Sequence, residues 1–384
     1  MKVTIFNNVS KKYLTEQIPD FQEVSFQDEP EVIFVRSEKL KDQPLPKSLI
    51  AICRPGAGVD NIPIDWCNKN GVVIFNAPGA NANAVKELVI WALISASRKV
   101  LPAIQFLNEN SALNNTEIEK LKGNYQGSEI ANKRIYIIGL GTIGSLVAKT
   151  CRALEMTVYA YDPYAPKEKF NDLIKINSLE DVPACDFISI HSVLTPETAK
   201  LVNENFLNKV KPGVKLLNFA RAELIDQEAL YAAMRKDLVS IYASDFPDAK
   251  LKTLFPDRAI FLPHLGASTL EAEEGALSMV TRQLINFWNE GQIENSVNFP
   301  SCRLEMNDYF RLIVSNFNVP GMISEITKLL GESGYNVTAM VNKSRGEVGY
   351  NIIDIDNPSS DMSSVIGQIM NIQGVTKVRY LKKP

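Results

Sequence analysis

The chain of 384 residues contains only two histidines, which narrows the search for a group that exchanges protons near neutral pH. His264 stands in the segment L-P-H-L-G-A-S-T, just past a predicted strand. An imidazole can give a proton to a forming alkoxide or take one from a hydroxyl group. We therefore expect His264 to be an acid–base group; the alternative is a buried histidine whose hydrogen bonds are satisfied within the fold.

Arg221 carries a second side chain suited to chemistry, in the segment N-F-A-R-A after an earlier predicted strand. A guanidinium can bind a carboxylate through two parallel hydrogen bonds and so fix a 2-oxo or 2-hydroxy acid in one orientation. Together with His264, this arginine indicates hydride transfer beside a nicotinamide. The alternative for Arg221 is an ordinary surface ion pair.

A glycine motif predicts where a dinucleotide binds. Gly139, Gly141 and Gly144 form G-x-G-x-x-G directly after the apolar run 135–138, and a helical pattern begins at Thr142. The first glycine permits a tight turn, the second lets the main chain approach a pyrophosphate, and the third lets helix and strand pack closely. The N-terminus of the helix favours the phosphates. The alternative is a glycine-rich structural turn.

The acid that closes this segment selects between coenzymes. Asp162 lies at the carboxyl end of the next predicted strand, 157–161. A carboxylate there accepts hydrogen bonds from a ribose diol and repels a 2′-phosphate, and only Lys167 follows closely as a counter-charge. The sequence therefore favours NAD over NADP.

A parallel α/β sheet has to bring these residues together. The apolar runs 187–190, 215–219, 240–244 and 260–262 continue the strand pattern, and His191, Arg221, Asp245 and His264 follow them in that order. Ligands bind outside the carboxyl ends of strands in open α/β sheets, so we expect these four residues to face one crevice. His191, followed by S-V-L-T-P-E-T, is either a wall of the coenzyme site or a structural residue.

Two further units flank this sheet. Apolar runs before residue 76 predict a smaller parallel sheet, followed by a long helix over 85–107 and by weak structure over 108–132. A helix over 270–289 leads the chain back towards that first unit. After residue 306 the order strand, helix, strand, strand, helix, strand predicts a ferredoxin-like domain of about seventy residues.

Composition limits the classes of function. The net charge of −3 offers no basic stripe for nucleic acid. The five scattered cysteines contain no C-x-x-C pair and predict neither disulfides nor a metal site. The chain opens as a strand without the apolar region of a secretory leader, and its longest apolar run, 88–96, is too short to span a membrane. We expect a cytoplasmic protein.

Five separated motifs together resemble the D-isomer-specific 2-hydroxyacid dehydrogenase family. They are G-L-G-T-I-G, Asp162, H-S-V-L-T-P-E-T, N-F-A-R-A-E-L-I-D and P-H-L-G-A-S-T, in the family's order. The segments R-P-G-A-G-V-D-N-I and N-A-P-G-A-N-A-N-A-V-K-E-L, with the C-terminal unit, are similar to members that oxidise 3-phosphoglycerate to 3-phosphohydroxypyruvate in serine synthesis and carry a regulatory ACT domain.

The resemblance implies a fold and a domain plan. It implies a Rossmann-type coenzyme domain over 96–284, inserted into a smaller flavodoxin-like α/β substrate domain formed by 1–95 and 285–300. An ACT domain over 306–384 would follow. ACT domains commonly pair sheet to sheet, so the resemblance also implies a homo-oligomer.

The resemblance also implies roles for individual residues. Arg54 and Asn81 would hold the substrate phosphate with Ser37 nearby, Arg221 would orient the substrate, and His264 would be the acid–base group. The residues that would line NAD are Gly139, Gly141, Ile143, Gly144, Asp162, His191, Val193, Thr198, Ala220, Asp245 and Gly266. Asn318 and Asn336 fall where the family's serine-binding asparagines fall, which implies L-serine as an effector; the alternative is that both cap turns.

One departure from the family concerns the partner of His264. The family places a glutamate a few residues after Asp245, but this chain reads D-F-P-D-A-K-L there. Without an opposite charge the imidazolium is disfavoured and proton transfer weakens. Asp248 is the nearest acid in the sequence, and we expect it to substitute for the glutamate. A second departure is Asn316, which stands where a histidine is often found.

Two alternatives to a phosphoglycerate-oxidising enzyme remain. One keeps the reaction but changes the acid, for example to another D-2-hydroxy acid or to glyoxylate. Arg54 distinguishes these cases, since a phosphorylated substrate needs a cation there, unless this arginine holds its own loop. The other alternative is an NAD-binding regulatory protein with vestigial catalysis, to which the missing glutamate lends weight.

Overall fold

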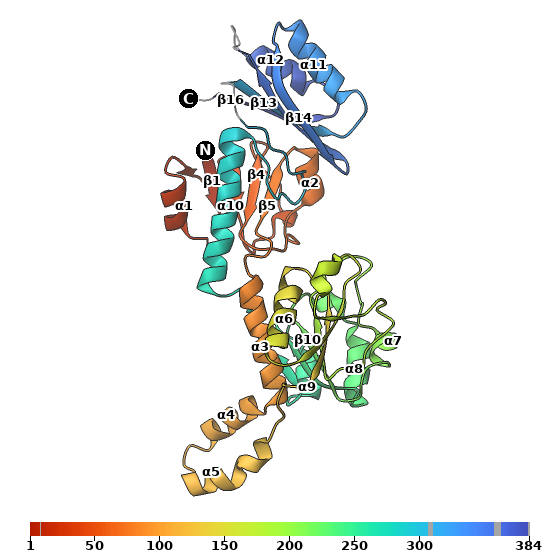
Figure 1. Cartoon of the computed structure of the whole chain (residues 1–384). Coiled ribbons are helices and arrows are strands. Elements are labelled where there is room, and N and C mark those ends of the chain that lie inside the picture. Colours follow the sequence, from red (N-terminus) through yellow and green to blue (C-terminus); the bar gives the residue numbers. More distant parts are fainter. Residues whose placement is uncertain (8, 306–309, 357–361, 383–384) are drawn as a thin grey trace. The chain divides into compact units, whose positions relative to one another are not determined.

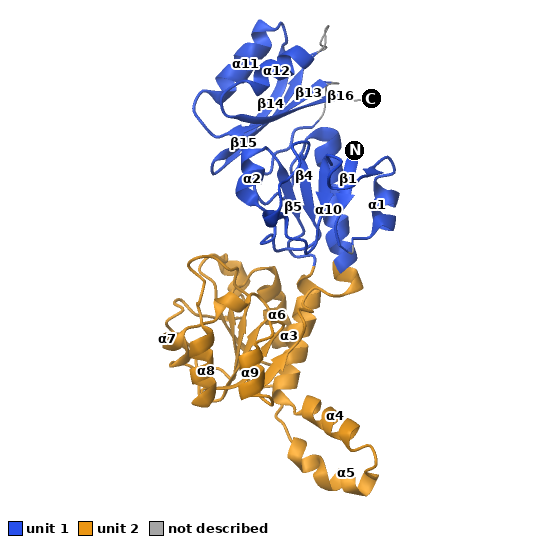
Figure 2. Cartoon of the chain, turned by 180° about the vertical axis from the view of Figure 1, so that it is seen from behind, with its two compact units in different colours: residues 1–80, 273–384 blue, residues 81–272 orange. Residues whose placement is uncertain are grey.

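The computed structural model describes residues 1–7, 9–305, 310–356 and 362–382, and the chain folds as two compact units (Figures 1 and 2). The first unit comprises Met1–Ala80 and Glu273–Pro384, and the second comprises Asn81–Ala272. Both crossings between the units fall earlier in the chain than the expected boundaries at 95/96 and 284/285. Helix α3 (Ala82–Ser97) packs on the second unit's sheet, and most of α10 (Leu270–Glu290) lies in the core of the first.

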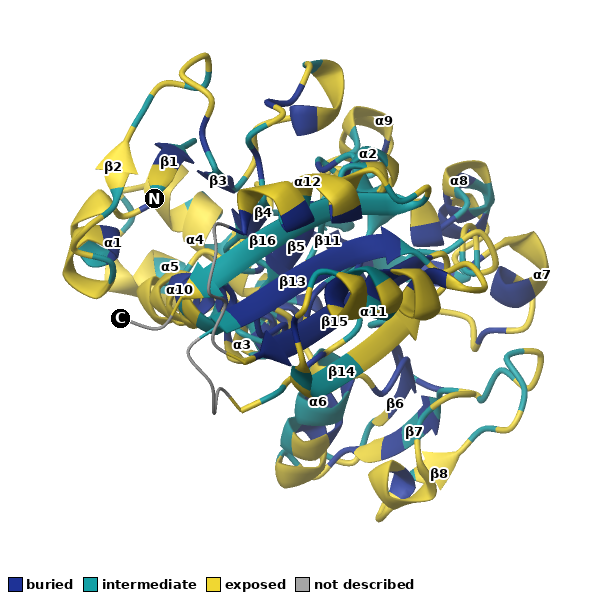
Figure 3. Cartoon of the chain, turned by 90° about the horizontal axis from the view of Figure 1, so that it is seen from above, coloured by how far each residue is buried: buried dark blue, intermediate teal, exposed yellow. Residues whose placement is uncertain are grey.

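The second unit is built on a seven-stranded parallel sheet in the order β12-β11-β10-β9-β6-β7-β8. Its strands are β6 (Arg134–Ile138), β7 (Thr157–Tyr161), β8 (Ile174–Lys175), β9 (Phe187–Ile190), β10 (Val214–Asn218), β11 (Val239–Ser244) and β12 (Ala259–Phe261). The inner strand β6 is almost wholly buried (Figure 3). The chain runs from β6 outwards in one direction and then returns to β9 on the other side of β6. This reversal is the switch point at which α/β sheets bind ligands.

Helices cover both faces of this sheet. They are α3, α6 (Thr142–Ala153), α7 (Glu204–Leu207), α8 (Gln227–Arg235) and α9 (Ala249–Leu254). Two cores result: one contains Val89 and Val147 of α3 and α6, the other Leu230 and Met234 of α8. The predicted doubly wound architecture is therefore confirmed.

The long helix predicted over 85–107 is interrupted. Helix α3 ends where Arg98 adopts an extended conformation, and α4 (Val100–Glu109) begins two residues later. The segment expected to have weak structure contains α5 (Asn115–Leu121), which starts with a capping box between Asn114 and Glu117. The helices α4 and α5 form a hairpin that projects from the second unit (Figure 1).

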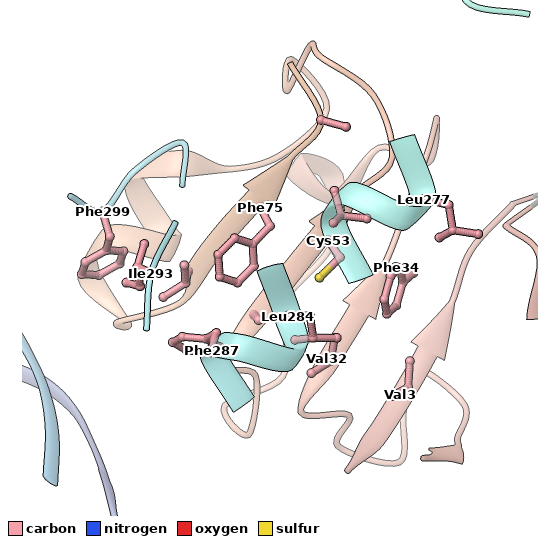
Figure 4. Packing of buried hydrophobic residues seen from close by; sticks show 14 of the residues in the cluster. Val3, Val32, Phe34, Cys53, Phe75, Leu277, Leu284, Phe287, Ile293 and Phe299 are labelled. Carbon is pink, nitrogen blue, oxygen red and sulfur yellow. The ribbon is translucent and has the colours of Figure 1, made fainter. Parts of the chain in front are cut away.

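The first unit contains a five-stranded parallel sheet in the order β2-β1-β3-β4-β5. Its strands are β1 (Lys2–Ile5), β2 (Gln22–Glu23), β3 (Val32–Phe34), β4 (Ala51–Arg54) and β5 (Val73–Asn76), with helices α1 (Lys11–Gln17) and α2 (Ile64–Lys69). Helix α10 covers one face, where Leu284 and Phe287 pack against Val32, Cys53 and Phe75 (Figure 4).

The C-terminal part of the first unit is an antiparallel sheet in the order β14-β15-β13-β16, which is the predicted ferredoxin-like topology. It comprises β13 (Phe310–Phe317), α11 (Met322–Glu332), β14 (Val337–Arg345), β15 (Val348–Ile355), α12 (Ser363–Met370) and β16 (Val375–Lys382). One face packs on its own two helices. The other face contributes Ile313, Tyr350 and Ile352 to the core beneath α10, so β13 and β15 are buried while β14 is largely exposed (Figure 3).

Side chains of this second sheet cap the C-terminus of α10. Arg379 donates to the carbonyl oxygens of Phe287 (3.1 Å) and Trp288 (3.0 Å), and its guanidinium lies 4.5 Å from the centre of the Phe287 ring. Arg311 donates to the carbonyl of Glu290 (2.9 Å). The last carbonyls of a helix have no partner within it, and cations favour that end of its dipole. These contacts make the C-terminal sheet part of the first unit's core.

Candidate active site

The glycine motif has the geometry of a phosphate-binding turn. Gly139 has a φ of +97°, and a Cβ on it would lie 2.8 Å from the main chain of His191. A Cβ on Gly144 would lie 2.0 Å from the Gly139 carbonyl oxygen, so only glycine lets α6 approach β6 this closely. Gly141 caps α6 without a side chain and faces open space. The first N–H groups of α6 are therefore accessible to a pyrophosphate.

Asp162 and Lys169 hold this turn from two sides. Asp162 Oδ2 accepts the Leu140 N–H (2.7 Å), and Oδ1 accepts the N–H groups of Tyr164 and Ala165 (2.9 and 3.0 Å). A carboxylate has about four acceptor positions, so Asp162 can still accept a ribose hydroxyl. Lys169 donates to the Leu140 carbonyl (2.8 Å). Sequence reasoning named Lys167 as the nearby cation and missed Lys169, which a 3₁₀ turn carries back to the glycines.

The segment after β9 lies against the same turn. His191 shares a hydrogen bond with Ser189 (2.9 Å), and burial lowers its pKa to about 4, so the ring is neutral at physiological pH. Val193 is 77% exposed, while Thr198 donates to the Val193 carbonyl (2.6 Å). The structure thus presents Val193 to solvent on a loop that Thr198 fixes.

Arg221 is positioned by a buried amide at the end of β10. Asn218 is fully buried; its side chain donates to the Arg221 carbonyl (2.8 Å) and accepts the Ala220 N–H (3.1 Å). The Arg221 guanidinium donates to the Ala220 carbonyl (2.7 Å). Asn218 was not singled out from the sequence, although its position in N-F-A-R-A, directly before two expected site residues, was the available signal.

His264 is exposed and held in an unusual backbone conformation. Its φ of +50° is uncommon for a residue with a side chain, and such strain often accompanies functional positions. The His264 N–H donates to the Asp245 carbonyl (3.0 Å), and the ring lies 5.1 Å from that of Phe246, centre to centre. The imidazole makes no hydrogen bond within the described part of the chain. The alternative of a buried, internally satisfied histidine is therefore wrong.

Asp245 is a buried carboxylate on which the charges of both proposed reactive side chains, His264 and Arg221, act. It is 2% exposed, and its Oδ2 accepts the Gly266 N–H (3.0 Å). Burial raises its pKa, while the Gly266 N–H, the charge of His264, its own N–H and the charge of Arg221 act in the opposite direction. Oδ1 is buried without a hydrogen-bond partner of good geometry among the residues described.

Asp248, expected to pair with His264, has a different role. Its Oδ1 accepts the Leu251 N–H (2.8 Å) as the N-cap of α9, and its Oδ2 accepts the Tyr231 hydroxyl (2.6 Å). Both oxygens are engaged away from His264. The expectation failed because proximity in sequence suggested a partner, whereas the turn before α9 directs this carboxylate into its own helix.

Ser37 and Arg54 belong to the first unit. Ser37 follows β3 and Arg54 ends the neighbouring β4, so both lie at the carboxyl edge of one parallel sheet. The Ser37 N–H donates to the Asn7 side chain (2.9 Å). Gly56 leaves room for the Arg54 guanidinium, since a Cβ on Gly56 would lie 2.5 Å from Nη1.

Three asparagines expected to bind ligands differ in their hydrogen bonds. Asn81 begins the second unit, where its buried Oδ1 has no hydrogen-bond partner among the described residues. Asn318 donates to the Gly346 carbonyl (3.1 Å) and thereby ties the β14–β15 turn. The Asn336 N–H donates to Asp356 (3.1 Å).

Asn316 is buried in a hydrogen-bonded network of asparagine side chains. Its oxygen accepts from Asn351 (2.7 Å), whose own oxygen accepts from Asn342 (2.7 Å). Its amide nitrogen donates to the Phe317 carbonyl (2.7 Å). The residue that stands at the family's frequent histidine position therefore stabilises the sheet.

This fold and these strand ends define a class of protein. Residues 90–266 match the NAD binding domain of the D-isomer specific 2-hydroxyacid dehydrogenases, and the chain belongs to that family. It is 32% identical to D-3-phosphoglycerate dehydrogenase of Archaeoglobus fulgidus over 319 residues, which cover 80% of this chain and 57% of that protein. It is 33% identical to D-3-phosphoglycerate dehydrogenase of Bacillus subtilis over 285 residues, 73% of this chain and 52% of the relative. The chain thus spans about half the length of these relatives.

Solved structures agree with this assignment. An NAD+-bound 3-phosphoglycerate dehydrogenase of Entamoeba histolytica is similar with a TM-score of 0.63 and 26% identity, covering 78% of this chain and 98% of that one. A glyoxylate reductase of Paecilomyes thermophila gives a TM-score of 0.67 at 24% identity, covering 77% and 98% respectively. The second likeness shows the fold alone. No helix among the described residues is long and apolar enough to cross a membrane.

Proposed function

We propose that this protein oxidises 3-phosphoglycerate to 3-phosphohydroxypyruvate with NAD, a reaction of serine synthesis. The observation that carries the proposal is the arrangement at the carboxyl ends of one sheet. The glycine turn follows β6, Arg221 follows β10, and His264 follows β12. The relatives named D-3-phosphoglycerate dehydrogenase support the choice of substrate.

Each of these residues has a separate role in the proposed reaction. Gly139, Gly141 and Gly144 admit the pyrophosphate, and Asp162 selects the ribose diol. Bound NAD supplies the hydride acceptor. Arg221 binds the substrate carboxylate and so orients the C2–H bond. His264 takes the hydroxyl proton as the carbonyl forms.

A phosphorylated substrate requires a further cation. We assign this role to Arg54, with Ser37 and Asn81 as hydrogen-bonding partners. An arginine binds phosphate through two donors, and an unphosphorylated acid has no group to use them.

Steady-state kinetics with different acids test the substrate. We expect NADH formation with 3-phosphoglycerate and little with D-lactate, and Arg54→Gln should lower kcat/KM for 3-phosphoglycerate about 100-fold or more. The same change should leave D-lactate turnover unaffected, which makes D-lactate the matched control. Preference for D-lactate, or for glyoxylate in the reverse direction, would instead support a dehydrogenase for another acid.

A regulatory NAD-binding protein is the second candidate. The observation that favours it is Asp248, whose carboxylate is bound elsewhere and leaves His264 without the family's usual partner. This candidate predicts NADH binding without turnover of any of the three acids. Turnover of 3-phosphoglycerate at ordinary enzyme rates would remove it.

We also propose that the protein is a homo-oligomer in which a second copy covers α4. None of the residues of α4 is buried. Its exposed large apolar residues are Val100, Leu101, Ile104 and Leu107. Contiguous exposed apolar surface marks interaction sites. Light scattering should give a mass of at least twice 42.7 kDa, and Ile104→Glu should reduce it; a monomeric wild type would contradict the assignment.

L-serine is the effector that we propose for the C-terminal sheet, with Asn318 and Asn336 as its contacts. Support comes from their positions beside β13 and β14 of the ferredoxin-like fold. Calorimetry with millimolar serine should give saturable heat that Asn318→Ala removes. Absence of heat with the wild type would eliminate serine as the effector.

A further inference from the structure

The buried carboxylate of Asp245 has few hydrogen bonds within the described residues. Oxygen Oδ2 has one N–H partner, from Gly266, and Oδ1 has no partner of good geometry among the described residues. An ionised carboxylate is rarely buried unless opposite charge compensates it. The positive groups that act on it are His264 and Arg221, both proposed to meet the substrate.

The same segment fixes the position of His264. The Asp245 carbonyl accepts the His264 N–H (3.0 Å), the Asp245 carboxylate accepts the Gly266 N–H (3.0 Å), and Phe246 lies against the imidazole. Two bonds from one residue therefore hold the loop on both sides of Leu265. A side chain on Gly266 would come within 3.0 Å of Asp245 Oδ2, so the glycine is what allows the contact.

We propose that Asp245 is the positioning carboxylate of His264: its negative charge stabilises the imidazolium, and its two hydrogen bonds hold the loop in place. In this chain it takes over from the glutamate that the family places a few residues later. During oxidation the substrate hydroxyl proton passes to His264, and Asp245 favours the charged product of that transfer. The catalytic use of the Asp245–His264 pair rests on the proposed function. The electrostatic interaction between the two residues does not depend on it.

The other charged and titratable groups around the pair cannot replace Asp245. Arg221, after β10, has the wrong sign to stabilise an imidazolium. Asp248, at the start of α9, is engaged by Leu251 and Tyr231. Tyr242, on β11, is neutral at physiological pH because burial raises its pKa to about 12.

Histidine NMR on the coenzyme-free full chain tests the proposal. There are only two histidines, and burial lowers the pKa of His191 to about 4, so few ring signals have to be distinguished. In Asp245→Asn we expect the midpoint of the His264 titration to move to lower pH by about one unit or more, the effect of removing the opposite charge that acts on the imidazole. Asp248→Asn is the matched control and should leave the midpoint in place.

A midpoint that is the same in Asp245→Asn and wild type would overturn the proposal, as would an equal shift in Asp248→Asn. The wild type offers a second measurement if Asp245→Asn does not fold. Because the two groups interact, the His264 signal should show a second inflection at acidic pH, where Asp245 takes up its proton. A single inflection would overturn the proposal. These results do not depend on turnover, so failure to oxidise 3-phosphoglycerate is a separate outcome.

Discussion

The two halves of the second unit's site are built on different principles. In the coenzyme half, main-chain geometry does the work: the glycine turn exposes N–H groups, Asp162 accepts the Leu140 N–H, and Lys169 donates to the Leu140 carbonyl. In the acid–base half, side chains do the work. His264 has a positive φ, and Oδ1 of Asp245 is buried without a hydrogen-bond partner among the described residues.

The difference follows from what each half has to do. A pyrophosphate is bound by a fixed array of N–H donors, so a rigid and fully bonded turn suits it. A proton-transfer group has to change charge during the reaction, so it needs a polarised setting and an accessible face. Substitutions in the first half should therefore weaken coenzyme binding or change coenzyme preference, whereas those in the second should spare binding and reduce the rate.

Gly144→Ala should have the largest effect on coenzyme binding. Its Cβ would lie 2.0 Å from the Gly139 carbonyl oxygen, so α6 has to move away from β6 and the turn opens. We expect NADH affinity to fall about 100-fold or more, measured by the quenching of protein fluorescence. Gly275→Ala, where a Cβ meets open space on α10, is the control and should bind normally. Normal binding by Gly144→Ala would show that the close packing is unnecessary.

His264→Gln should lower kcat by about 10²–10⁴-fold, the usual contribution of a general acid–base group. NADH affinity should be unchanged, since the side chain lies in the other half of the site. Stopped-flow measurement of the hydride-transfer step would separate a chemical defect from a binding defect. A variant that retains the wild-type rate would mean that another group moves the proton.

Asp162→Ser should change coenzyme preference by about tenfold in favour of NADP. The change removes the charge that repels a 2′-phosphate. It also removes the carboxylate that accepts the Leu140 N–H, so the turn is held less firmly. Ratios of kcat/KM for NAD and NADP provide the measurement, with Asp172→Ser as an exposed control after the same strand. An unchanged ratio of the two kcat/KM values would mean that Asp162 only stabilises the turn and does not select the coenzyme.

The smallest effect should come from Asp248→Ala. Loss of the α9 cap should cost about 1 kcal/mol of unfolding free energy, with a further loss from the unpaired Tyr231 hydroxyl. Denaturant unfolding gives the stability, and kcat should stay within about twofold of wild type because the two carboxylate oxygens bond Tyr231 and Leu251. A large fall in kcat at unchanged stability would mean that Asp248 does act with His264 in proton transfer.

The sequence predicted the coenzyme half well because its rules are local. A strand, three glycines, a helix and an acid at fixed spacing leave few arrangements, and the structure has them. The acid–base half was predicted only in part. The strand-end rule placed Arg221 and His264 after β10 and β12, where the structure has them. Side-chain partners depend on tertiary packing, so Asp248 was chosen by sequence proximity and Asn218 was missed, as was Lys169 in the coenzyme half.

Long-range packing also decided what the sequence left undetermined in the fold. Helix α3 looked like part of the first unit, but its apolar side chains pack with those of α6. The C-terminal sheet has its own core with α11 and α12, as predicted, but nothing in the sequence indicated that its Arg311 and Arg379 also bond the end of α10. No local pattern marks an arginine on a strand as the cap of a helix far away in the sequence.

The central claim is that the two halves act together on 3-phosphoglycerate. The most direct test is to mix the purified chain with NAD and 3-phosphoglycerate and follow NADH absorbance, with His264→Gln as the reference. The account predicts steady NADH formation that depends on 3-phosphoglycerate and falls at least about 100-fold in the variant. NADH formation no faster than that of the variant, by a chain that still binds NADH, would contradict it.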